Sequence, residues 1–168
     1  NPYLALKGLS TALYKALVAS GVDVPSQGSL IATIADQDKA EALPIIRRFA
    51  RLGFEIYATA GHPDKRDYVR SLGVEQVFDS RSLEFVDGIR AATGGEGVDV
   101  VLNALAGEFI PASLGLLRPQ GRFVEIGKRD LLADTPLHLA PFLRNLSFAA
   151  FDLGQIVDAR HPELPAMF

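Results

Sequence analysis

The stretch "SLIATIADQDKAEALPIIRRFARLGFEIYATAG", from Ser29 to Gly61, decides the fold class of this 168-residue chain. It begins with a short apolar run, continues with apolar residues at helical spacing, and ends with a second apolar run. This order predicts a strand, a helix and a second strand, which is how nucleotide-binding α/β domains begin. The turn after the first strand, "IADQDKAE", contains no glycine, although dinucleotide-binding turns carry glycines at that place.

The same alternation continues along the chain. Apolar, strand-like runs occupy residues 29–35, 54–60, 75–79, 98–105, 121–127 and 146–153. Helical patterns occupy residues 3–20, 36–53, 62–73 and 82–95, and residues 107–121 read as a helix followed by a turn. The pattern predicts a single α/β domain over residues 1–168, a three-layer, doubly wound, Rossmann-like fold with a mostly parallel sheet of about six strands.

Composition excludes several classes of function. A net charge of −3 gives no basic face for nucleic acid, and no apolar run is long enough to span a membrane. The chain has no cysteine, and its three histidines, His62, His138 and His161, lack metal-ligand spacing, so no metal site is expected. We expect a cytoplasmic protein. A start at Asn1 instead of Met is typical of a recombinant protein, and a truncated last element would leave an edge open to self-association.

The run from Ala12 to Gly61, with "IADQDK" and "LGFEIYATAG", resembles the methylglyoxal-synthase-like domain of the carbamoyl-phosphate synthase large subunit. In that family the loops after the first two strands bind an anionic effector. The resemblance implies anion-binding roles for Lys39 and Thr59. His62 stands where that family has a threonine, so half of the anion site is missing.

The run from Tyr57 to the end, with "VFDSRSLEF", "GVDVVLNALAGE" and "GRFVEIGKRD", resembles the nucleotide-binding subdomain of polyketide-synthase enoylreductases in the medium-chain reductase superfamily. That family reduces carrier-bound enoyl chains with NADPH. The resemblance implies that the cofactor would be bound by residues after the second, fourth and fifth strands, namely Lys65, Arg66, Asn103 (with Ala104), Gly127 and Lys128. It also offers Lys65 and Asp87 as weak candidates for proton donors, although charged side chains of this kind are usually ordinary surface residues.

These two resemblances predict an engineered chimera of a carbamoyl-phosphate-synthase-like half (residues 1–61) and an enoylreductase-like half (residues 62–168). Such a scaffold would have no natural catalytic function, and we expect neither enzyme activity of the isolated chain nor a cofactor. Asp36 and Asp38 would repel a pyrophosphate where glycines normally bind it. The first alternative is a module that retains NADP(H) binding, and the second is a weak anion- or effector-binding module.

Overall fold

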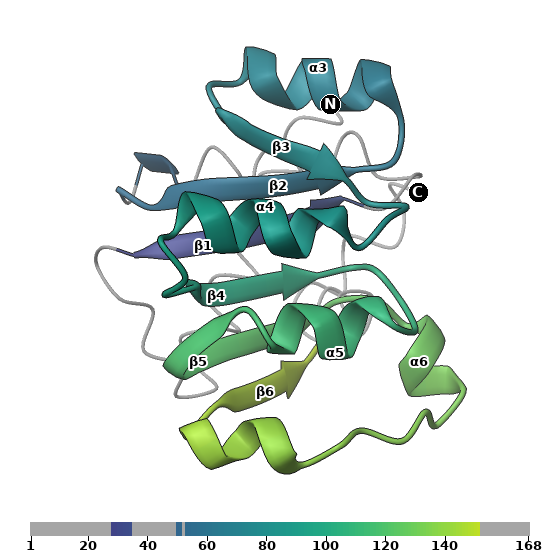
Figure 1. Ribbon diagram of the computed structural model, residues 1–168. Coiled ribbons are helices and arrows are strands. Elements are labelled where there is room, and N and C mark those ends of the chain that lie inside the picture. The colour runs from purple at the N-terminus through teal and green to yellow at the C-terminus, as the bar shows by residue number, and fades with distance from the viewer. Residues whose placement is uncertain (1–27, 35–49, 52, 152–168) are drawn as a thin grey trace, which may run out of the picture.

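A parallel sheet organises the part of the chain that the computed structural model describes, residues 28–34, 50–51 and 53–151. Its strands are β1 (Ser29–Ile34), β2 (Glu55–Ala60), β3 (Gln76–Asp79), β4 (Val98–Asn103), β5 (Leu117–Glu125) and β6 (Ser147–Ala150). They lie in the order β3-β2-β1-β4-β5-β6, and every neighbouring pair is parallel (Figure 1). This order confirms the predicted doubly wound, Rossmann-like fold. The predicted helix over residues 3–20, the turn "IADQDKAE" after Ile34, most of the predicted helix over residues 36–53, and the tail lie outside the described residues.

Five helical segments connect the strands in this part of the chain. They are α3 (Pro63–Ser71), α4 (Glu84–Ala92), α5 (Phe109–Leu114), α6 (Arg129–Leu132) and the 3₁₀ helix η1 (Ala140–Arg144). Helix α3 begins where predicted, because Pro63 suits a first turn and Nδ1 of His62 accepts from the backbone N–H of Asp64 at 3.4 Å. Helices α4 and α5 lie over one face of the sheet in Figure 1.

Apolar side chains cover both faces of the sheet. The α4/α5 face is filled by Tyr57, Phe85, Ile89, Leu114 and Phe123, all of which are at most 1% exposed. A second cluster on the other face includes Ala58, Val69, Val77, Leu102 and Val124. Burial on both faces explains why these strands are apolar throughout instead of alternating.

Strand β5 differs from its prediction, because it begins at Leu117 and not at Gly121. Leu117 pairs with Val98, and the register then shifts between Val98 and Val100. Gln120 has a left-handed backbone (φ 65°). The turn predicted from the sequence is therefore an irregularity inside the strand.

The topology defines where a ligand can bind. The strand order reverses direction between β1 and β4, and in open α/β sheets the crevice at the carboxyl ends of the strands near this reversal receives ligands. We therefore expect a ligand to contact residues at the ends of β2, β4 and β5.

Candidate functional site

A buried carboxylate joins the ends of β4 and β5. The Nδ2 group of Asn103 donates to Oε2 of Glu125 at 2.7 Å and also to the carbonyl oxygen of Leu105 at 2.6 Å. The backbone N–H of Gly127 donates to the other oxygen of Glu125, Oε1, at 2.6 Å. Asn103 and Glu125 are 0% and 2% exposed. The structure thus brings together two predicted cofactor residues, Asn103 and Gly127, through a third residue that the sequence analysis missed.

Burial changes the acidity of Glu125. Desolvation raises the pKa of its carboxyl from 4.5 to about 7, although the hydrogen bonds from Asn103 and Gly127 act to lower it. The negative charge of Asp130 raises this pKa further. A carboxyl group that titrates near neutral pH at the carboxyl edge of a sheet marks a candidate functional site.

A second carboxylate joins the same two loops. Oδ2 of Asp130, in α6, accepts from the backbone N–H of Gly107 at 2.9 Å. Gly107 lies in the loop after β4 and has φ +68°, a conformation that favours glycine. Figure 1 shows α6 beside this loop.

Gly127 is a glycine because the two loops approach each other closely. A Cβ atom there would lie 2.7 Å from Oε1 of Glu125 and 3.2 Å from the carbonyl oxygen of Ala104. Its neighbour Lys128, also a predicted cofactor residue, is exposed. The loop after β5 is therefore shaped by its contact with the loop after β4.

Two other predicted cofactor residues lie at the end of β2, separated from Asn103 by β1 in the sheet. Nη1 of Arg66 donates to the carbonyl oxygen of Ala60 at 3.0 Å and pairs with Asp79 at 3.2 Å. Lys65 is only 7% exposed, so the expectation of an ordinary surface side chain is wrong for this residue. The reason is its position: Lys65 lies one turn before Val69 on the buried face of α3.

The remaining predicted site residues do not join this group. Asp87 is exposed on α4, as expected of a surface residue. Thr59 is fully buried in β2, and within the described residues its Oγ1 has no hydrogen-bond partner. Lys39, its proposed partner in anion binding, lies outside the described residues. The anion-binding roles of Lys39 and Thr59 therefore stay predictions.

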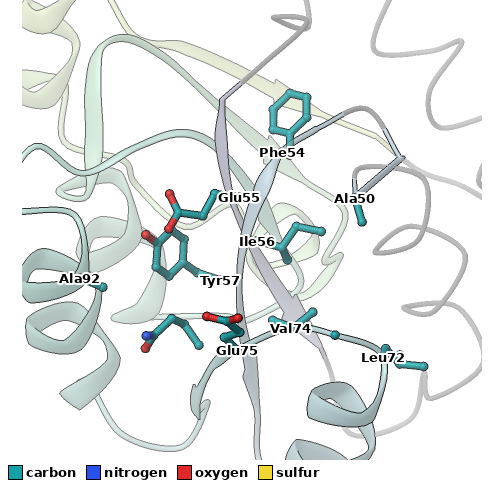
Figure 2. A pocket seen from close by; sticks show the side chains of 11 residues that line it. Ala50, Phe54, Glu55, Ile56, Tyr57, Leu72, Val74, Glu75 and Ala92 are labelled. Atoms are coloured by element: carbon teal, nitrogen blue, oxygen red, sulfur yellow. The ribbon is translucent and has the colours of Figure 1, made fainter.

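A cavity of about 310 Å³ lies at the opposite end of the strands. Its lining includes Phe54, Glu55 and Tyr57 at the start of β2, and Glu75 and Gln76 at the start of β3. Figure 2 shows the Glu55 and Tyr57 side chains on one side of β2 and Ile56 on the other. Burial, together with a hydrogen bond to Glu55, raises the pKa of Tyr57 to about 12, so the phenol stays protonated. This cavity is at the amino edge and is separate from the candidate site.

Known proteins have related sequences and related structures. The family model of zinc-binding dehydrogenases matches residues 47–167. The nucleotide-binding subdomain of the enoylreductase domain of PpsC from Mycobacterium tuberculosis is 34% identical, with a TM-score of 0.76, over 94% of this chain and 86% of that one. The chain belongs to the polyketide-synthase enoylreductases of the zinc-binding dehydrogenase family. This family membership confirms the second resemblance.

Two further relatives agree with this enoylreductase assignment. A putative enoyl reductase domain of a polyketide synthase is 33% identical with a TM-score of 0.77, over 96% of this chain and 85% of that one. Phthioceranic/hydroxyphthioceranic acid synthase of Mycobacterium tuberculosis is 58% identical over 111 residues, which are 66% of this chain. The chain spans only 5% of the length of that synthase.

These relatives overturn the interpretation of the chain as an engineered scaffold without natural function. Structures of one family align with 94% and 96% of the chain, so a single family covers both sides of Gly61. One enoylreductase family therefore accounts for both parts of the chain, and the proposed separate origin of residues 1–61 is wrong.

The family model is named for zinc binding, and in proteins His, Cys, Asp and Glu side chains supply the ligands of zinc. The sequence has no cysteine, and the described part of the chain contains no group of three or more His, Cys, Asp or Glu side chains that could hold a metal ion. The residues that the structure describes therefore do not fit a zinc site. The described helices are also all too short or too polar to cross a membrane.

Proposed function

We propose that this chain is the NADPH-binding subdomain of a polyketide-synthase enoylreductase. The observation that carries the proposal is the pair of loops after β4 and β5, joined by the buried Asn103–Glu125 contact at the carboxyl edge of the sheet. When bound there, NADPH would supply a hydride to the double bond of an enoyl substrate. The substrate itself would depend on parts of the synthase beyond this subdomain.

The loops fit the nicotinamide end of a dinucleotide. Gly127 has no side chain and lies against Ala104, and the backbone at Gly107 has open space where a Cβ would point. Backbone groups and small residues allow the close approach that a flat nicotinamide ring and its ribose require. In this role the backbone groups at Asn103 and Gly127 contact the cofactor. Lys128 lies at the exposed rim of the cofactor site.

The other end of the cofactor would lie at the end of β2. The two contacts of Arg66 with Ala60 and Asp79 both use Nη1, and a guanidinium has further N–H donors that suit a 2′-phosphate. Asp79 opposes this role, because its carboxylate would repel the phosphate. Because the remaining donors of Arg66 suit the 2′-phosphate, we propose a preference for NADPH over NADH that depends on Arg66 and that Asp79 reduces.

The turn "IADQDKAE" should limit the affinity. Its lack of glycine removes the usual backbone approach to the pyrophosphate, and Asp36 and Asp38 add negative charge. We expect a dissociation constant for NADPH weaker than about 10 μM.

Titration calorimetry with NADPH and NADH tests the proposal. NADPH binding in the range of about 10 μM to 1 mM supports it, and binding tighter than about 10 μM would show that the turn "IADQDKAE" does not weaken the site. If NADPH fails to bind at about 1 mM, the proposal that this chain binds the nucleotide is wrong.

A further inference from the structure

We propose that Glu125 and Asp130 are positioning residues that together hold the loop after β4 against the loop after β5, and so set the space that receives the nicotinamide end of the cofactor. The inference rests on the proposed function and adds a role for two carboxylates that touch no reacting atom.

Glu125 controls the start of the loop after β4. Its two oxygens accept from Asn103 on β4 and from the backbone N–H of Gly127 on its own loop, at 2.7 and 2.6 Å. Asn103 in turn bonds both backbone groups of Leu105, donating to its carbonyl oxygen at 2.6 Å and accepting from its N–H at 3.2 Å. The orientation of Glu125 is thereby passed to Leu105 through one buried amide.

Asp130 holds the far end of the same loop. It accepts from the N–H of Gly107 at 2.9 Å, and Gly107 begins the turn into α5. A single attachment at Asn103 would leave the loop free to rotate about that point. Two attachments, at Asn103 and Gly107, fix both its position and its direction.

The cost of burying Glu125 argues for a role in the site. A buried carboxylate loses hydration, and apolar side chains of similar volume often serve stability as well or better. Here the carboxylate lies beside the edge where the proposed cofactor binds, and both of its oxygens accept from groups that shape the loops. A group needed only for packing would not require these two directed acceptors.

Amide hydrogen exchange of the whole, unliganded chain tests the two attachments directly. In Asp130→Ala, exchange of the Gly107 N–H should become about tenfold faster, whereas Asp130→Asn keeps an acceptor oxygen and should restore protection. In Glu125→Gln, one acceptor oxygen becomes an N–H₂ donor. If this group faces Gly127, exchange of the Gly127 N–H should become faster by a similar factor, and if it faces Asn103, exchange of the Leu105 N–H should, because the Asn103 amide loses its partner. The matched control is Glu108→Gln, which removes a neighbouring exposed charge and should change none of these rates.

Binding of two ligands separates positioning from general loss of structure. NADPH reaches the loops, whereas adenosine 2′,5′-bisphosphate lacks the nicotinamide end. Glu125→Gln and Asp130→Ala should weaken NADPH about tenfold and change adenosine 2′,5′-bisphosphate by less than about twofold, with Asp130→Asn close to the original protein. Equal losses for both ligands, or no loss for NADPH, would overturn the positioning role.

The two measurements also separate this inference from the proposed function. If the original chain binds no NADPH but the exchange rates change as expected, the two carboxylates hold the loops as described. The proposed NADPH-binding function is then wrong. If NADPH binds and the exchange rates do not change, the function stands and the positioning role is wrong. Should Glu125→Gln fail to fold, the Asp130→Ala and Asp130→Asn pair alone decides the outcome.

Discussion

Replacement of Glu125 by glutamine should remove a large pH dependence of stability. Burial raises the pKa of Glu125 from 4.5 to about 7, so between these values the folded protein holds a proton that the unfolded chain releases. A state that binds more protons is favoured at low pH, and stability therefore falls as pH rises through this window. The difference between the two pKa values corresponds to roughly 3 kcal/mol, of which about 2.5 kcal/mol is lost between about pH 5 and pH 8.

Urea unfolding at about pH 5 and pH 8 measures this effect. Glutamine does not titrate, so the free energy of unfolding of the original chain, minus that of Glu125→Gln, should fall by about 2.5 kcal/mol from the lower to the higher pH. Taking this difference cancels the titration of groups common to both proteins. A difference constant within about 0.5 kcal/mol would refute the assignment of a buried carboxyl with a raised pKa.

The charged neighbours of Glu125 provide a further check. The negative charge of Asp130 raises the pKa of Glu125, and Lys128 lies on the exposed side of the same loop. Asp130→Asn should therefore lower the pKa of Glu125 and shift the pH window of the stability loss downward. A window that does not move would show that Asp130 has no influence on this carboxyl.

Three other substitutions have defined outcomes. Gly127→Ala places a Cβ 2.7 Å from an oxygen of Glu125, so it should cost about 1–3 kcal/mol, read from thermal melting, and an unchanged melting temperature would contradict the close approach of the loops. Phe123→Ala removes a fully buried ring from the core and should cost about 3–5 kcal/mol in urea unfolding, and a loss below about 1 kcal/mol would mean that the ring is not packed as described. Arg66→Ala also breaks the pair with Asp79, and it should weaken NADPH more than NADH in calorimetry, whereas equal weakening would exclude a role for Arg66 in choosing the 2′-phosphate.

The fold could be predicted from the sequence because its signals are local and repeated. Each of the six strands in the structure overlaps an apolar run, and Pro63 and Gly73 bracket a helix of the predicted type. The start of β5 at Leu117 could not be predicted, because its pairing with Val98 depends on a register shift between distant segments. Turn residues inside a strand look like the end of that strand when only the sequence is considered.

The site could be predicted only in part. Asn103 and Gly127 were predicted from the enoylreductase resemblance, and the structure places them together, but Glu125 was missed because it lies inside the run "GRFVEIG", which reads as a core strand. One signal was present: an acidic residue at the end of an apolar strand needs buried donors. Lys65 shows the opposite error, since its charge suggested exposure and the helix face on which it lies buries it.

The separate origin of residues 1–61 was wrong for a related reason. Short runs such as "LGFEIYATAG" describe a strand and its flanking turns, and many α/β families share that pattern. Only an alignment over nearly the whole chain distinguishes one family from two.

The strand order also determines when the protein can fold during its synthesis. Strand β1 lies in the middle of the sheet, yet one of its two neighbours is β4, and the N–H of Ser29 bonds to Oδ2 of Asp99, 70 positions later in the chain, at 2.8 Å. Until β4 leaves the ribosome, one side of an apolar central strand has no partner and is open to pairing with other chains. A nascent chain that ends before Val98 should therefore depend on chaperones, and the subdomain should acquire protease resistance only after residues 98–103 have emerged.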